Sequence, residues 1–169
     1  MILGTSKSDG HTHRLVKEFT VLSNATVFEL TNYNISFYDY AHENRGDDFL
    51  SLINKLADFD HIVFASPVYW YCMSAQLKVF FDRLSDLLTI EKPLGRSLKG
   101  KSISILSTGY DAKCPECFLR PFILTAEYLQ MKYVGYEYAS IQDEIDLNCL
   151  GDVAAKALKS IYLDNELRN

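Results

Sequence analysis

The sequence predicts an α/β fold in which helices cover both faces of a five-stranded parallel sheet of order 2-1-3-4-5. Short apolar, β-branched runs alternate along the chain with longer stretches in which apolar residues follow helical spacing. This alternation favours right-handed strand–helix–strand crossovers, which make neighbouring strands parallel. The other common doubly wound order has six strands and a glycine-rich first turn, and neither feature is found here.

Each element is predicted from its local pattern. The strands are the short apolar runs at residues 1–3, 25–30, 61–65, 101–106 and 133–139. The helices are the periodic stretches at residues 12–22, 48–57, 75–88, 118–131 and 152–163. Residues 32–47 and 91–100 are expected to be connecting segments. The first strand is expected to be short, because residues 1–4 span only about 13 Å at roughly 3.3 Å per residue.

The third predicted helix has the clearest helical pattern. Its apolar residues recur every three or four positions and form a single stripe, as expected for a helix that packs on a sheet. They are Leu77, Phe80, Phe81, Leu84, Leu87 and Leu88.

Composition limits the class of protein. With 169 residues, 48% hydrophobic and 23% charged, the chain is expected to form a single domain over residues 1–169. No apolar run reaches about 18 residues and the start does not resemble a secretory signal, so we expect a cytoplasmic protein without a membrane span. The net charge of −5 has the wrong sign for a nucleic-acid partner.

Ligands of open parallel sheets bind beyond the carboxyl ends of the strands, where the strand order reverses. In the order 2-1-3-4-5 this point lies between the first and third strands, so the loops to inspect are residues 4–12, 66–74 and 107–111. Residues 4–12 combine hydroxyls and Lys7 just before a helix, which favours a phosphate cradle. The alternative is a hydrophilic turn with Thr12 as the helix cap.

The second loop carries three consecutive aromatic residues, Tyr69, Trp70 and Tyr71, which cannot all face a core. Exposed aromatic residues often mark a binding surface, although each ring could instead pack on a neighbouring helix or subunit. In the third loop, Gly109 permits a close backbone approach and Tyr110 could stack on a ligand. An ordinary glycine turn would explain that loop equally well.

Two motifs carry a family resemblance. Residues 66–70 are Ser-Pro-Val-Tyr-Trp, and residues 74–83 are Ser-Ala-Gln-Leu-Lys-Val-Phe-Phe-Asp-Arg. With these motifs the chain resembles the flavodoxin-like NAD(P)H-dependent FMN reductase family, whose members carry a Ser-Pro-Val-Tyr-Trp-like segment followed by Ser-x-Gln-Leu-Lys-x-Phe-x-Asp-Arg. The likeness spans nearly the whole chain and implies a flavodoxin-like three-layer sandwich.

The resemblance also implies a site for FMN. The residues expected to hold its phosphate are Thr5, Lys7, His11 and Thr12. The residues expected to line the isoalloxazine ring are Pro67, Val68, Tyr69, Trp70 and Met73. Backbone from Thr108, Gly109 and Tyr110 is expected near the pyrimidine edge of the ring.

The activity implied by the resemblance is that of an oxidoreductase, in which FMN takes electrons from NADPH or NADH and passes them to a quinone, nitro, azo or flavin acceptor. No catalytic side chain or metal is expected, and Trp70 and Tyr110 are candidates for stacking or gating. A homodimer is expected, because the family commonly builds its pocket at a subunit interface. The alternatives are a flavodoxin-type electron carrier that does not oxidise NAD(P)H, and a flavin-free regulatory protein on the same fold.

Cys114 and Cys117 form a Cys-x-x-Cys motif. Such a pair can be redox-active or supply half of a zinc site, but no second pair with metal-ligand spacing is visible. Four cysteines without an export signal suggest a reducing cytosol. Inert thiols are therefore the preferred interpretation, and the acidic residues 143–146 are expected to form a solvated loop.

Overall fold

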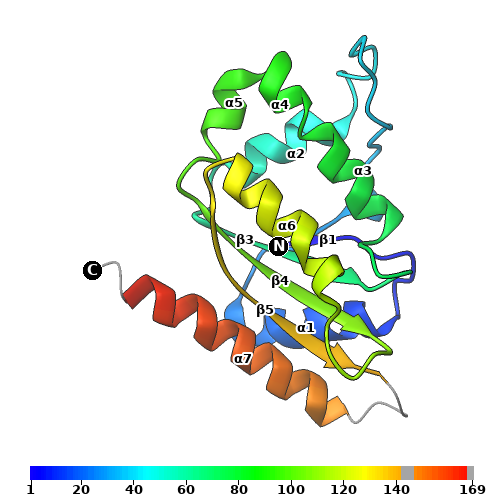
Figure 1. Ribbon diagram of the computed structural model, residues 1–169, viewed down its shortest axis with the longest axis vertical. Helices are drawn as coiled ribbons and strands as arrows, with labels where there is room; N and C mark the ends of the chain where they lie inside the picture. The colour runs from blue at the N-terminus through cyan, green and yellow to red at the C-terminus, as the bar shows by residue number, and fades with distance from the viewer. Residues whose placement is uncertain (142–146, 167–169) are drawn as a thin grey trace.

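The computed structural model describes residues 1–141 and 147–166, with five strands in one sheet of order β2-β1-β3-β4-β5 (Figure 1). All four neighbouring pairs are parallel, which confirms the predicted sheet. The strands are β1 (Ile2–Leu3), β2 (Phe28–Glu29), β3 (His61–Pro67), β4 (Ser102–Gly109) and β5 (Lys132–Ser140). The two central long strands, β3 and β4, run side by side to the edge where the candidate loops begin.

Helices cover both faces of the sheet, as predicted. They are α1 (His11–Ser23), α2 (Asp48–Leu56), α3 (Ala75–Arg83), α4 (Asp86–Thr89), α5 (Lys92–Arg96), α6 (Glu116–Tyr128) and α7 (Leu147–Glu166), with a 3-10 turn η1 (Leu30–Asn32) after β2. Figure 1 shows α1 and α7 on one face and α2 through α6 on the other. The described chain is therefore a three-layer sandwich.

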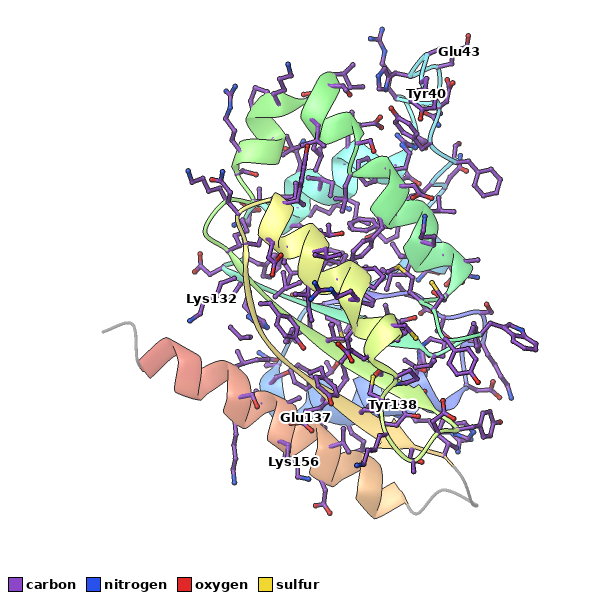
Figure 2. All side chains as sticks on the ribbon, viewed as in Figure 1. Tyr40, Glu43, Lys132, Glu137, Tyr138 and Lys156 are labelled. Atoms are coloured by element: carbon purple, nitrogen blue, oxygen red, sulfur yellow. The ribbon has the colours of Figure 1, made fainter. Side chains whose placement is uncertain are left out.

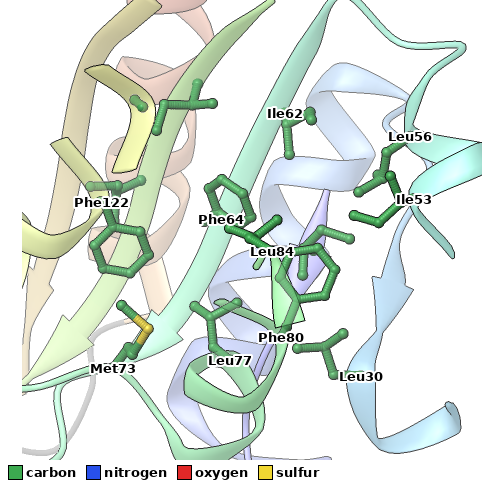
Figure 3. Close-up of a cluster of buried hydrophobic side chains, with 14 of the residues drawn as sticks. Leu30, Ile53, Leu56, Ile62, Phe64, Met73, Leu77, Phe80, Leu84 and Phe122 are labelled. Atoms are coloured by element: carbon green, nitrogen blue, oxygen red, sulfur yellow. The ribbon is translucent and has the colours of Figure 1, made fainter. Parts of the chain in front are cut away.

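Alternating side chains of β3 form the two halves of the core. Ile62 and Phe64 point into a cluster with α2, α3 and α6, whereas Val63 and Ala65 point into a cluster with α1 and α7. In the first cluster the ring of Phe64 lies 6.1 Å from that of Phe122 on α6 (Figure 3). Burial on both faces explains why residues 62–65 of this strand are all apolar.

The predicted helix 75–88 is wrong in its length, because the structure breaks it into α3 and α4. The break follows Arg83, whose buried guanidinium turns to bond the carboxylate of Asp86 at 2.8 Å. The backbone carbonyl of Asp86 then accepts the N–H groups of Ile90 and Glu91. The apolar spacing continues across the break, but Leu88 at its far end is 42% exposed.

Two further predictions need correction. The predicted strand 25–30 is shortened to β2 because the chain turns into η1, and the expected connection 91–100 contains α5, which has a proline in its first turn. Residues 33–47 contain no helix or strand, as expected. In this segment, Nδ1 of His42 lies 2.9 Å from the Asp86 carboxylate. The acidic residues 143–146 lie outside the described part of the chain.

Candidate functional site

The three candidate loops meet at the carboxyl ends of β1, β3 and β4, as predicted from the topology. The N–H of Gly4 donates to the carbonyl of Ala65 at 2.9 Å, which joins the first loop to β3. The N–H of Val68 donates to the carbonyl of Thr108 at 2.8 Å, which joins the second loop to the third. The hydroxyls of Thr12 and Thr108 lie 2.7 Å apart and complete the connection.

Gly4 lets the first loop leave β1 against α3. A Cβ at this position would lie 2.7 Å from the Cβ of Leu77 and 2.8 Å from the hydroxyl of Ser74. No side chain fits there without moving packed atoms. The same loop contacts α3 again through Ser6 and Gln76, whose side chains are within hydrogen-bond distance. The Ser-x-Gln-Leu motif therefore supports the first loop directly.

The start of α1 is built to receive an anion. The first N–H groups of any α-helix have no partner within the helix, and here the N-cap is Gly10, without a side-chain cap. The first turn contains no acidic residue, and Lys7 stands beside it with its side chain 70% exposed. The helix dipole gives the loop a positive potential, while Asp9, whose carboxylate lies 3.7 Å from Lys7 Nζ, partly offsets the charge of the lysine.

His11 is the first residue of α1, and its Nδ1 is buried with no hydrogen-bond partner among the described residues. Burial lowers the pKa of His11, and the charges of Arg14 and Lys7 lower it further. A buried polar atom without a partner is costly and usually indicates an absent ligand or water. The neutral ring can offer Nδ1–H to an oxygen at the helix start.

Thr12 does not cap the helix, so that alternative is wrong. It is the second residue of α1, and its buried hydroxyl pairs with Thr108 at the end of β4. Thr5 is also buried, with its hydroxyl near the N–H and carbonyl of Lys7. Both threonines thus shape the loop from inside, while Lys7 and His11 provide its cationic and donor groups.

The aromatic segment of the second loop is a strained two-residue turn. Tyr69 and Cys72 exchange two backbone hydrogen bonds of 2.9 Å each, with Trp70 and Tyr71 between them. Trp70 has φ 48° and Tyr71 has φ 63°, in the left-handed region that aromatic residues rarely adopt. Trp70 is 94% exposed, Tyr71 60% and Tyr69 43%. The turn therefore holds its rings outside the core.

The rest of the second loop is anchored internally. The hydroxyl of Ser66 donates to the carbonyl of Pro67 at 2.8 Å and accepts the N–H of Ser74 at 2.9 Å. Met73, expected to line the ring of FMN, instead packs in the apolar core and is 4% exposed (Figure 3). Sequence reasoning missed the clamping role of Ser66, although it opens the motif.

The third loop approaches β5 closely. A Cβ on Gly109 would lie 2.7 Å from the hydroxyl of Tyr138, which donates to the carbonyl of Asp111 at 2.8 Å. Figure 2 shows Tyr138 near the carboxyl end of β5. Burial raises the pKa of Tyr138 to about 12, so it stays a donor at neutral pH. Tyr110 is 74% exposed. Sequence reasoning missed Tyr138, which only the register of β5 against β4 brings to this loop.

Residues 1–144 match the family described as NADPH-dependent FMN reductase. The chain belongs to this family. Within the NADPH-dependent FMN reductase family, sequence relatives include YwqN of Bacillus subtilis, named as an NAD(P)H-dependent FMN-containing oxidoreductase and 33% identical over 94 residues. That match spans 52% of this chain and 52% of YwqN, so the chain spans about half the length of this relative.

A second relative is KefG of Escherichia coli, named as an ancillary protein of the glutathione-regulated potassium-efflux system. It is 33% identical over 133 residues, covering 72% of this chain and 67% of KefG. Among solved structures, general stress protein 14 of Treponema denticola in complex with FMN has a TM-score of 0.67 and 21% identity, covering 97% of this chain and 96% of that one. This likeness confirms the flavodoxin-like fold.

The residues present fit the cofactor of an FMN reductase family member. An uncapped helix start with a lysine, threonine hydroxyls and an unpartnered buried imidazole nitrogen offers donors suited to a phosphate. Exposed rings at the neighbouring loops offer surfaces suited to a flat heterocycle. The prediction of an FMN-dependent oxidoreductase is confirmed at the level of the family.

No group of three or more His, Cys, Asp or Glu side chains among the described residues is arranged to hold a metal ion. No helix in the same part of the chain is long and apolar enough to cross a membrane.

Proposed function

We propose that this chain is an NAD(P)H-dependent flavin oxidoreductase that reduces a quinone, nitro, azo or flavin acceptor with electrons from NADPH or NADH. The observation that carries the proposal is that two features lie at the same edge of the sheet. One is the start of α1, which has no side-chain cap and no acidic residue in its first turn, and where Nδ1 of His11 lacks a partner among the described residues. The other is the exposed aromatic turn, with its strained backbone. The family match supports the reaction class. The names of the relatives support FMN as cofactor.

Each loop has a separate task in this proposal. Lys7, His11 and the first N–H groups of α1 bind the phosphate, while Thr5 and Thr12 fix the loop around it. Val68 lines the face of the ring, and backbone from residues 108–110 lies near its polar edge. When bound, FMN supplies the hydride and electron-transfer chemistry.

The exposed rings define the face at which the substrates meet the site. Trp70 and Tyr110 are 94% and 74% exposed, so they are free to stack on a nicotinamide or an aromatic acceptor and to exclude water from it. Because the donor and the acceptor are both planar, one aromatic surface serves both in turn. We assign these rings stacking and gating roles, with no side chain acting as an acid or base.

The phosphate assignment is tested by titrating the purified chain with FMN and following absorbance and flavin fluorescence. We expect His11→Ala to weaken FMN binding about ten- to hundredfold, because a hydrogen bond to a charged group contributes about 1.5–3 kcal/mol. The matched control is His13→Ala on the same turn, since His13 lies 3.9 Å from Glu29 and faces away from the loop. Equal affinity of His11→Ala and wild type would refute the assignment.

Reaction class is tested separately by NADPH or NADH consumption with a quinone. Rapid consumption supports the oxidoreductase, whereas tight FMN binding without consumption favours an electron carrier of the flavodoxin type. The net charge of −5 is small for a carrier, which docks on reductases through strong charge.

A regulatory role without flavin draws its support from KefG, which is named as an ancillary protein. A protein that stays colourless after FMN addition would favour that role.

We further propose that residues 1–169 form one FMN-binding domain that acts as a homodimer in the cytosol. Light scattering tests the dimer.

A further inference from the structure

The Cys-x-x-Cys motif lies against the candidate site. Cys117 is the second residue of α6, is exposed, and donates its S–H to the carbonyl of Tyr71 in the aromatic turn at 3.8 Å. Cys114 is half-buried, with its sulfur 4.0 Å from the hydroxyl of Ser107 at the end of β4. Near the start of α6, one thiol therefore contacts the aromatic turn of the second loop, and the other contacts the end of β4, where the third loop begins.

The two thiols differ in access. Burial, with a smaller contribution from neighbouring Cys117, outweighs the hydrogen bond with Ser107 and raises the pKa of Cys114 to about 11. At neutral pH this makes its thiolate about a hundredfold scarcer than that of an ordinary cysteine. Cys117 is exposed and is the thiol that a dissolved oxidant meets first. The protected Cys114 precedes the accessible Cys117 by three residues, and two cysteines at this Cys-x-x-Cys spacing can act as a redox pair.

We propose that Cys114 and Cys117 form a reversible disulfide by exchange with a small-molecule disulfide, and that its formation changes the aromatic turn. The Cys117 thiolate attacks one sulfur of the small disulfide, whose S–S bond breaks and releases a thiolate that takes up the proton Cys117 lost. The Cys114 thiolate then attacks the Cys117 sulfur and displaces the second small thiol, which takes up the proton Cys114 lost. Two protein thiols are oxidised, and one small disulfide is reduced to two thiols.

Disulfide formation removes the S–H that Cys117 donates to Tyr71. The turn already holds Trp70 and Tyr71 at positive φ, so the loss of a contact at its carbonyl alters the position of its rings. The inference goes beyond the proposed function, because neither the exchange nor the change in the turn depends on FMN. Its failure would leave the flavin assignment untouched.

The test uses the full chain without FMN, equilibrated with defined ratios of reduced to oxidised glutathione, followed by acid quenching, alkylation and peptide mapping. We expect a Cys114–Cys117 disulfide that dithiothreitol reverses. The chain contains a single tryptophan, so the emission of Trp70 reports on the turn directly. We expect this emission to change with the same glutathione ratio that forms the disulfide.

Three variants sharpen the outcome. Cys117→Ser should abolish both the disulfide and the emission change, and Cys114→Ser should leave a stable glutathione adduct on Cys117. Cys72→Ser is the matched control, because Cys72 is an exposed thiol of the same turn, and it should form the disulfide normally. Thiols that stay reduced in fully oxidised glutathione, a bridge that requires Cys72, or a disulfide with unchanged Trp70 emission would each overturn the proposal.

Discussion

Arg83 is the residue whose replacement should cost the fold most. Its side chain is fully buried, with Nε 2.8 Å from Asp86 and Nη1 2.5 Å from Asp47, both nearly buried carboxylates. Nη1 also donates to the carbonyl of Ser36 at 3.2 Å. Arg83→Leu removes the cation while leaving two carboxylates in the interior. It also removes the contacts with Asp47 and Ser36 that tie the segment 33–47 to α3.

The expected loss of stability in Arg83→Leu follows from the burial of its ion pairs. Removing one partner of a buried ion pair costs about 3–5 kcal/mol, because the other charge is left without compensation. This is a large share of the roughly 5–15 kcal/mol that stabilises a typical domain. An exposed pair offers the contrast: Lys78 and Asp82 are 2.5 Å apart on α3 but each about half exposed. Such a pair contributes only about 0.3–0.5 kcal/mol.

Urea unfolding at pH 7, followed by circular dichroism, measures both effects. With a slope of about 2 kcal/mol/M, the midpoint of Arg83→Leu should fall by about 2 M. The midpoint of the control Lys78→Ala should fall by less than about 0.3 M. Similar midpoints for the two variants would refute the claim that burial decides the strength of these pairs.

The same variant has a pH signature. Burial alone raises the pKa of Asp47, but hydrogen bonds from Arg83, Ser36 and Phe49 outweigh it and hold the pKa below 3.8. A lowered folded-state pKa contributes stability that is complete above the unfolded value and is lost as pH falls through the folded value. Without Arg83, only the hydrogen bonds from Ser36 and Phe49 oppose burial, so the pKa of Asp47 rises and the pH-dependent part of its contribution shrinks. The difference in unfolding free energy between wild type and Arg83→Leu should therefore become smaller from pH 7 to pH 3. A difference that does not change with pH would contradict this account.

Three other variants test the site. Gly4→Ala should lower the unfolding free energy by about 1–3 kcal/mol, since its Cβ would lie 2.7 Å from a side chain of α3, whereas Gly46→Ala, with open space around it, should not. Thr108→Val should cost about 1–3 kcal/mol in urea unfolding by leaving the buried hydroxyl of Thr12 without its partner. Trp70→Gly should raise the thermal midpoint by relieving φ 48° while weakening FMN binding in titrations. Unchanged midpoints would count against each explanation.

The sheet order and the meeting of the three loops were predictable, because both follow from strand alternation and topology. The break in helix 75–88 was not, because it depends on the buried bonds of Arg83 to Asp47 and Asp86. Asp47 lies 36 positions away along the chain. The local spacing of apolar residues does not indicate a contact between residues so far apart in the sequence.

Within the site, the motifs predicted correctly which loops come together, but they predicted the directions of individual side chains less well. Met73 follows directly after the turn, so the hand of that turn decides that it enters the core. Tyr138 reaches Asp111 only because β5 pairs with β4 in a register set by the whole strand. Side-chain direction at loop ends is thus a property of tertiary packing, which a local motif does not specify.

The strain in the aromatic turn is itself an argument for function. Positive φ costs about 1–3 kcal/mol at a residue with a side chain, and Trp70 and Tyr71 both adopt it. Glycine or asparagine would form the same two-residue turn with far less strain. Neither ring repays the strain by burial, since Trp70 is 94% and Tyr71 60% exposed. Rings held outward at a cost to stability, beside the uncapped start of α1, would be explained by contacts with molecules that bind at the proposed site.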